Sequence, residues 1–326
     1  MPTFSDTDGK AVGFGVIGTG MISGLFAETL NSMSGAKLRA VYSRNLDTGR
    51  TYAEKYRAEK VYTDLSAMLS DPAVDAVYVA SPTVCHAEHT VAALRKGKHV
   101  LCEKAFSTDY RSARLMLDTA SECGLVLLEA MRPNHDPFYL KLSECIERIG
   151  TVRSAHLEYC QYSSRYDRFK NGILTNAFDP QMKNSAISDI GIYPFTVAVN
   201  LFGEPSEIQH GKVRLDNGFI GSGSLLLSYP EKTVTVTYSK LHDGMTPSVI
   251  EGELGTVTVD RITTPTRIEL SLRADGEKNV IKNGFSGCNM LFEISDFIDM
   301  IKGKKDNSPY LALTERVMRL LDGELY

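Results

Sequence analysis

The chain has 326 residues, of which 43% are hydrophobic and 23% charged, which is the composition of a globular protein with room for two domains. The net charge of −4 offers no basic surface to a phosphate backbone, so we expect no nucleic acid partner. No apolar run approaches the roughly 18 residues of a membrane helix, and the polar N-terminal segment resembles neither a signal nor a transit peptide, so we expect no membrane association.

The first part of the chain alternates short apolar runs with amphipathic stretches. The runs predict strands at 12–17, 38–42, 60–62, 76–80, 99–102 and 126–129, and the stretches predict helices at 21–32, 46–56, 65–70, 86–96 and 110–123. Strands that alternate with helices at this spacing form βαβ units around a parallel sheet, with helices on both faces. We therefore expect an α/β fold whose N-terminal domain, residues 1–130, is a doubly wound Rossmann domain.

The rhythm changes in the second part of the chain. Strands are predicted at 152–163, 206–215, 221–228, 233–241, 249–260, 267–273 and 279–281, and helices at 290–302 and 313–321. Turn sequences such as Asp216-Asn217-Gly218 separate the strands, as in antiparallel hairpins. Residues 131–326 are therefore expected to form an α+β domain with a large, mostly antiparallel sheet, to which we assign substrate binding and oligomerisation.

A glycine motif follows the first strand and opens the first helix. Gly18 permits a tight turn, Gly20 lets the backbone approach a pyrophosphate, and Ser23 is small enough for close packing of the helix on the strand. The phosphates would sit on the free N–H groups of this turn, to which Met21 and Ile22 belong, at the positive end of the helix dipole. A glycine-rich turn of no special purpose is the alternative. The order of strand, glycines and helix favours a dinucleotide.

The end of the second strand indicates which dinucleotide binds. An NAD site normally places Asp or Glu there, whereas the first acid here is Asp47, which we expect in the first turn of the next helix. Ser43 and Arg44 instead offer a hydroxyl and a guanidinium to a 2′-phosphate. We expect NADP(H) to be preferred, with NAD(H) possible. The alternative is that Arg44 is only a solvated residue at the start of a helix.

The six cysteines form no Cys-x-x-Cys pair, and several lie in apolar segments. They indicate reduced, buried thiols in a cytoplasmic protein. His86 and His89 are three residues apart on a predicted helix, but no third ligand accompanies them, so we expect no metal site.

Further motifs resemble those of one family. They are Ser81-Pro82-Thr83 followed by His86, then 97–104 with Glu103-Lys104, 149–152, and 188–194 with Asp189 and Tyr193. Together with the glycine motif, they make nearly the whole chain resemble the glucose-fructose oxidoreductase / inositol dehydrogenase / MocA (Gfo/Idh/MocA) family. The resemblance implies that Ser81, Pro82, His86, Glu103 and Lys104 lie at the cofactor.

The resemblance also implies catalytic residues. Lys104 matches the lysine of the family's Glu-Lys-Pro motif, which lies beside the nicotinamide, and Asp189 and Tyr193 match its Asp-x-Gly-x-His/Tyr motif. The tyrosine form looks most like the branch of dihydrodiol dehydrogenase and NADP-dependent xylose dehydrogenase. That branch tends to use NADP.

Hydride transfer at a carbonyl requires that a proton be delivered or removed. Free Lys and Tyr have pKa values near 10.4 and 10, but desolvation lowers that of lysine and an adjacent ammonium lowers that of tyrosine. We expect Tyr193 to be the acid/base and Lys104 its electrostatic partner, although the roles could be reversed. Asp189, four residues before Tyr193 and on the same face if helical, could orient the substrate or Lys104.

Three departures from the family pattern fall near the substrate region. Ala105 replaces the proline after Lys104, Asn184-Ser185-Ala186 replaces a Gly-Gly-Ala segment, and 130–137 lacks the usual aromatic cluster. The leading hypothesis is reversible hydride transfer between NADP(H) and a hydroxyl or carbonyl of a sugar, polyol or cyclic diol. The alternatives are a cofactor-binding sensor without turnover and an enzyme that uses the cofactor transiently to cleave a glycosidic bond.

The expected substrate cleft lies between the two domains, at the carboxyl ends of the parallel strands. The resemblance implies a homodimer or homotetramer in which the open face of the large sheet meets a second subunit. Ile268, Leu270 and Leu272 form an apolar face that would suit such an interface. Packing within the monomer is the other explanation of that face.

Overall fold

The computed structural model describes residues 11–274, 276 and 278–326, so the polar N-terminal segment assessed above lies outside the described residues. The chain divides into two compact units. The first unit comprises the residues up to Ala130 together with Cys288–Glu315, and the second comprises Met131–Gly287 and Arg316–Tyr326. The division at residue 130 coincides with that expected from the sequence, whereas 288–315, which we assigned to the second domain, group with the first unit.

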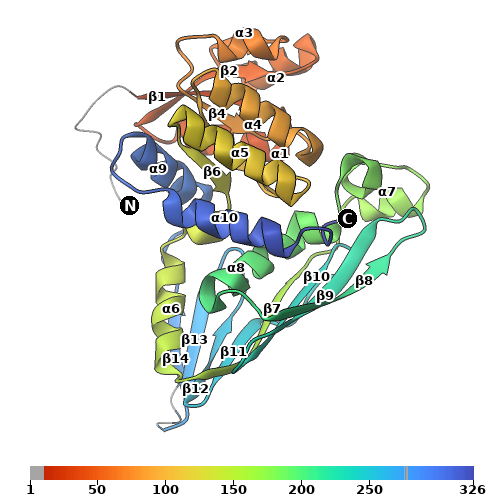
Figure 1. Cartoon of the computed structure of the whole chain (residues 1–326), viewed down its shortest axis with the longest axis vertical. Coiled ribbons are helices and arrows are strands. Elements are labelled where there is room, and N and C mark those ends of the chain that lie inside the picture. Colours follow the sequence, from red (N-terminus) through yellow and green to blue (C-terminus); the bar gives the residue numbers. More distant parts are fainter. Residues whose placement is uncertain (1–10, 275, 277) are drawn as a thin grey trace. The chain divides into compact units, whose positions relative to one another are not determined.

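The first unit contains a six-stranded sheet with the order β3-β2-β1-β4-β5-β6 (Figure 1). All of its paired strands are parallel. The strands are β1 Val12–Ile17, β2 Ala36–Tyr42, β3 Lys60–Tyr62, β4 Ala76–Val79, β5 His99–Glu103 and β6 Leu127–Ala130. This order reverses direction at β1, as in doubly wound dinucleotide-binding sheets, and it confirms the predicted Rossmann fold.

The helices of the first unit cover both faces of this sheet. They are α1 Met21–Asn31, α2 Leu46–Tyr56, α3 Leu65–Leu69, α4 His86–Arg95, α5 Tyr110–Cys123 and α9 Met290–Ile301, followed by α10 Ser308–Leu320, within which the division between the units falls. Phe26 of α1 stacks on Tyr78 of β4 with ring centroids 3.9 Å apart. Phe297 of α9 lies 6.1 Å from Phe14 of β1, so α9 completes the core of a sheet that ended some 160 residues earlier in the chain.

The second unit contains an eight-stranded sheet with the order β14-β13-β12-β11-β7-β10-β9-β8. Its strands are β7 Val152–Cys160, β8 Glu207–Arg214, β9 Ile220–Ser228, β10 Thr233–Ser239, β11 Ser248–Gly252, β12 Gly255–Val259, β13 Arg267–Leu272 and β14 Lys278–Lys282. The β7–β10 pairing is parallel and the other pairings are antiparallel, which confirms the predicted α+β domain with a mostly antiparallel sheet.

One predicted strand was wrong. Residues 249–260 form the hairpin β11–β12 rather than a single strand, with Glu253 and Leu254 at the turn. The sequence conceals the turn because it has no Asn-Gly or Asp-Gly signal. Gly252 and Gly255 flank the turn. Glycine is needed at both positions, because a Cβ at 252 would overlap the backbone oxygen of Ile149 and a Cβ at 255 would overlap that of Ser271.

Three helices of the second unit were not predicted: α6 Phe138–Arg148, α7 Tyr166–Lys170 and α8 Ile192–Phe202. The first eight residues of α8 are all buried. A helix that is apolar on every side has no 3.6-residue periodicity for sequence analysis to detect. Helix α8 contacts β7 and β10, and α6 contacts β12.

One face of the large sheet is packed under these helices. Val234, Val236 and Tyr238 of β10 are fully buried, whereas the intervening threonines are exposed or half-buried. Ile268 and Leu270 are also buried within the monomer and Leu272 is half-buried, so core packing, one of the two explanations left open above, accounts for most of that apolar face. Within the described part of the chain, no helix combines the length and apolar character needed to cross a membrane. All six cysteines are free. Cys102 and Cys145 are buried as expected, whereas Cys85, Cys160 and Cys288 are half-buried and Cys123 is exposed.

Candidate active site

The turn between β1 and α1 leaves the first turn of the helix open. Gly18 has φ +112°, and a Cβ there would lie 2.5 Å from the carbonyl oxygen of Ala80, so only glycine fits. Gly20 is the N-cap of α1 without a side-chain cap, and no heavy atom of the described residues lies within 4 Å of where its Cβ would be. The side chain of Met21 is exposed, and that of Ile22 packs against the core. An anion can therefore approach the N–H groups that begin α1.

Ser23 stabilises the turn between β1 and α1 through hydrogen bonds. Its buried Oγ donates to the carbonyl oxygen of Gly20 at 2.8 Å, and the hydroxyl of Tyr52 donates to the carbonyl oxygen of Ser23. The small side chain thus lets α1 lie close to the sheet, as expected from the motif.

Ser43 and Arg44 follow β2, and their side chains differ in exposure. Ser43 is buried, and its Oγ accepts a hydrogen bond from the backbone N–H of Asn45 at 3.3 Å. Arg44 is exposed, and among the residues that the structure describes it forms neither a hydrogen bond nor an ion pair. Asp47 lies in the first turn of α2, as predicted. Arg44 is therefore better placed than Ser43 to meet a 2′-phosphate.

His86 joins the loops that follow β4 and β5. Its side chain is buried, with Nε2 2.8 Å from the carbonyl oxygen of Ser81 and Nδ1 2.9 Å from that of Ala105. Burial lowers the pKa of His86 to about 4, although the contacts with the carbonyl oxygens of Ser81 and Ala105 act to raise it. Both ring nitrogens face backbone carbonyls, so His86 supports these loops from within. Ser81 and Pro82 lie in the first of the two loops, where the Oγ of Ser81 lies 2.9 Å from Nδ1 of His89.

The end of β5 places Lys104 beside buried carboxyl groups. Glu103 is buried and accepts a hydrogen bond from the hydroxyl of Tyr78, and the backbone N–H of Lys104 donates to Glu103 Oε2 at 3.2 Å. The peptide bond between Lys104 and Ala105 is cis. Gly18, Ser81 and Glu103 follow or end β1, β4 and β5, so the predicted cofactor residues of the first unit gather at the carboxyl edge of its sheet.

Glu129 of β6 was not predicted as a site residue. It is fully buried, and its Oε2 accepts a hydrogen bond from Oγ1 of Thr314 in α10 at 2.8 Å. The pKa of Glu129 is raised to about 7, because burial and the charge of Glu103, which raise it, outweigh Thr314 and the Lys104 ammonium, which lower it. Glu129 is therefore a carboxyl group that titrates near neutrality close to Lys104.

In the second unit, Asp189 and Tyr193 lie on consecutive helical segments. Asp189 belongs to the π-helical turn Ile187–Gly191, which leads into α8, where Tyr193 is buried in the first turn. Arg132 donates from a guanidinium nitrogen to the hydroxyl oxygen of Tyr193 at 3.3 Å, and its guanidinium carbon lies 5.8 Å from the centroid of the Tyr193 ring. The ring of Tyr159 meets that of Tyr193 edge to face at 6.0 Å.

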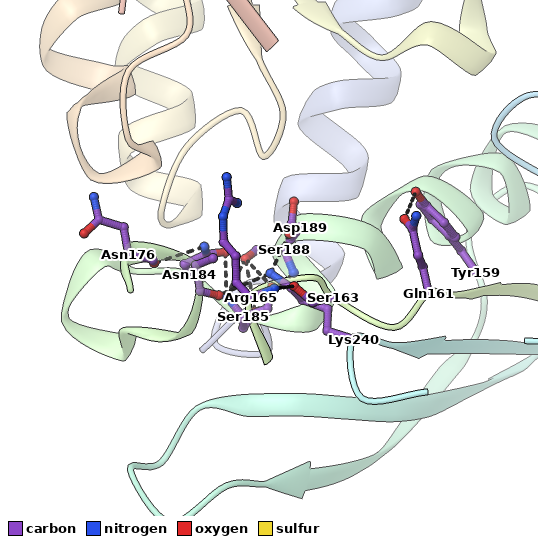
Figure 2. Close-up of polar contacts among 11 residues, drawn as sticks. Tyr159, Gln161, Ser163, Arg165, Asn176, Asn184, Ser185, Ser188, Asp189 and Lys240 are labelled. Atoms are coloured by element: carbon purple, nitrogen blue, oxygen red, sulfur yellow. Dashed lines mark hydrogen bonds and ion pairs between the residues drawn. The ribbon is translucent and has the colours of Figure 1, made fainter. Parts of the chain in front are cut away.

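Asp189 forms an ion pair with Lys240, a residue that sequence analysis missed. Nζ of Lys240 donates to Asp189 Oδ2 at 2.7 Å (Figure 2). It also donates to the carbonyl oxygen of Ala177 at 3.2 Å. The sequence did contain a signal: Val234, Val236 and Tyr238 point to the buried face of β10, and Lys240 continues their alternation.

Ser185, in the segment that departs from the family pattern, anchors the π-helical turn. Its Oγ donates to the carbonyl oxygen of Leu325. The same Oγ lies 3.1 Å from the Oγ of Ser188 (Figure 2). The serine thus ties the segment before Asp189 to the C-terminal end of the chain.

Residues 12–131 match the family model described as an oxidoreductase family with an NAD-binding Rossmann fold. The chain is 37% identical over 292 residues to scyllo-inositol 2-dehydrogenase (NADP(+)) IolU of Bacillus subtilis (strain 168), an alignment that covers 90% of this chain and 89% of that protein. The chain belongs to the Gfo/Idh/MocA family. This membership confirms the resemblance and the prediction of an NAD(P)-dependent oxidoreductase.

Other members of the Gfo/Idh/MocA family match over similar lengths. Trans-1,2-dihydrobenzene-1,2-diol dehydrogenase of Mus musculus is 24% identical over 329 residues, with 94% of this chain and 92% of that one covered. The crystal structure of a 3-ketoreductase from Actinomadura kijaniata, in complex with NADP and TDP-benzene, superposes with a TM-score of 0.83 at 23% identity. It covers 96% of each chain and shares the fold.

Proposed function

We propose that this chain is an NADP(H)-dependent oxidoreductase that transfers hydride to or from a hydroxyl or carbonyl carbon of a cyclic polyol, sugar or cyclic diol. The observation that carries the proposal is the 37% identity, along 90% of the chain, with an enzyme named scyllo-inositol 2-dehydrogenase (NADP(+)). The dihydrobenzenediol dehydrogenase supports the same class, because its substrate is also a ring with adjacent hydroxyl groups. We therefore expect inositols to be the first substrates to turn over.

The residues of the first unit fit a nicotinamide dinucleotide. The open backbone of Gly20, Met21 and Ile22 would hold the pyrophosphate, and the exposed guanidinium of Arg44 would bind the 2′-phosphate of NADP(H). Ser81, Pro82, Glu103 and Lys104 are proposed to line the rest of the cofactor site, while Ser43 and His86 support it from within. When bound, the nicotinamide supplies or accepts the hydride.

We propose that Tyr193 exchanges a proton with the reacting oxygen of the substrate. The Arg132 guanidinium beside the Tyr193 oxygen stabilises negative charge that develops there. The Lys104 ammonium provides a second positive charge for the alkoxide, and Asp189 accepts a hydrogen bond from a substrate hydroxyl.

Two variants test this assignment. Tyr193→Phe and Lys104→Ala should each lower kcat at least about 100-fold, the usual contribution of general acid–base catalysis. Affinity for NADPH, followed by the fluorescence of the nicotinamide because the chain has no tryptophan, should survive the Tyr193 change. Near-normal turnover in both variants would contradict the assignment. Tight NADPH binding by the parent without turnover of any inositol, sugar or diol would instead favour a sensor.

We also propose a homodimer or homotetramer formed through the face of the large sheet that lies opposite α8. Threonines and serines cover this face, among them Ser224, Thr235, Thr237, Thr256 and Thr258. Light scattering of the parent and of a variant with arginine at Thr237 would test it, because a charge in the interface should release monomers. The six free cysteines support a cytoplasmic location, where thiols stay reduced.

A further inference from the structure

A lysine occupies a core position next to the large sheet of the second unit. Lys240 follows β10 directly and, at 4% exposure, continues the row of Val234, Val236 and Tyr238, which are fully buried. Removing an ammonium group from water costs several kcal/mol unless partners replace its hydration. The contacts of Lys240 therefore indicate the role of its positive charge.

Lys240 has three kinds of partner. Its Nζ donates to Asp189 Oδ2 and to the carbonyl oxygen of Ala177, at 2.7 and 3.2 Å. It also lies 5.1 Å from the ring centroid of Phe178 and 5.6 Å from that of Phe219, within the range of cation–π attraction. The ammonium is thus contacted from several directions.

The ion pair is buried unevenly. The side chain of Lys240 is 5% exposed, whereas that of Asp189 is 36% exposed. Lys240 therefore contacts the Asp189 carboxylate from the protein interior, and part of the carboxylate remains accessible to solvent. The contact at Oδ2 restrains the orientation of the carboxylate.

The same lysine links separate segments of the unit. It joins the end of β10 to the π-helical turn through Asp189 (Figure 2) and to the 3-10 turn Asn176–Phe178 through Ala177. Phe178 stacks in turn on Tyr166 and Phe169 of α7. An aromatic cluster thus packs against the Lys240 ammonium that binds Asp189.

We propose that Lys240 is a positioning residue for the reaction proposed above, on which this inference rests. It orients the Asp189 carboxylate so that it accepts a hydrogen bond from a hydroxyl of a neutral polyhydroxylated substrate. Lys240 itself does not touch the substrate.

The test is a double-mutant cycle on turnover of scyllo-inositol with NADP⁺. Lys240→Met keeps the length and apolar stem of the side chain but removes the charge, and Asp189→Asn removes the carboxylate. Each should lower kcat/KM about 10- to 100-fold, the range for a hydrogen bond to a charged group. Because Lys240 acts through Asp189, the double variant should be no more than about threefold slower than Asp189→Asn alone.

Two controls separate positioning from folding. Lys232→Met removes a lysine at the other end of β10, where Nζ lies 5.4 Å from the ring of Tyr229, and should leave kcat/KM unchanged. NADPH affinity, which belongs to the first unit, should stay within about twofold in every variant if the fold persists. If Lys240→Met does not fold, Lys240→Gln, which can still donate to Ala177, is judged by the same cycle.

The outcomes are distinct. Losses of kcat/KM that multiply in the double variant would show that Lys240 supports only the fold, and would overturn the inference. Normal turnover by Lys240→Met, with an active parent, would overturn it as well. A parent that binds NADPH but oxidises no cyclic polyol would contradict the proposed function itself, and the role of Lys240 would fall with it.

Discussion

Glu129 allows the electrostatics of the first unit to be measured without any substrate. Its carboxyl group is fully buried, and its pKa is raised from 4.5 to about 7. Below pH 4.5 the group is protonated in both the folded and unfolded states and has no effect on stability. Between pH 4.5 and 7 it ionises only in the unfolded chain, so the free energy of unfolding falls as the pH rises. Above pH 7 the full cost, about 3 kcal/mol, is present.

The substitution Glu129→Gln removes this cost. The amide oxygen can still accept from Thr314, as Oε2 of Glu129 does at 2.8 Å, but the side chain cannot ionise. Among the described residues Oε1 of Glu129 has no hydrogen-bond partner, so the amide NH₂ that replaces it would be buried without an acceptor, and part of the gain is lost. We therefore expect the variant to be about 1–3 kcal/mol more stable than the parent at pH 9, and to differ by less than about 1 kcal/mol at pH 5.

The assay is urea unfolding followed by far-ultraviolet circular dichroism, at pH 5, 7 and 9. Glu122→Gln is the matched control, because Glu122 is exposed on α5 and its replacement should change stability little at any of these pH values. A Glu129→Gln effect of the same size at pH 5 and pH 9 would refute the reasoning, since it would mean that the change in stability does not come from ionisation.

Three further substitutions address the cofactor and the proton. Arg44→Ala should weaken NADPH binding about 10- to 100-fold and leave NADH binding within about twofold, as measured by nicotinamide fluorescence, because only NADPH has the 2′-phosphate. Gly20→Val should weaken both dinucleotides at least about 10-fold while the melting temperature stays unchanged, because a Cβ there meets open space within the described structure. Arg132→Met should lower kcat about 10-fold with unchanged NADPH affinity, because Tyr193 loses the cation at its oxygen. Unchanged kcat in that variant would mean that the contact at 3.3 Å has no catalytic role.

Sequence patterns predicted the first unit well because each of its features is local. An apolar run gives a buried strand, and the glycines at 18 and 20 stand directly between β1 and α1. The position of Asp47 in α2 could also be predicted, because it depends only on the cap formed by Asn45. In the second unit, the β11–β12 turn and α8 could not be predicted, because one lacks a turn signal and the other lacks polar residues to mark its exposed side.

The residues that sequence analysis missed in the site have a common physical reason. Lys240 and Glu129 are charged residues in buried runs, and a charge at a core position requires a partner. The alternation of β10 could have marked Lys240 as buried, and the apolar neighbours of Glu129 in β6 could have done the same for that residue. Their partners could not be found, because Asp189 lies 51 residues before Lys240 and Thr314 lies 185 residues after Glu129. Only the fold brings the two members of each pair together, so these contacts could be identified only from the structure.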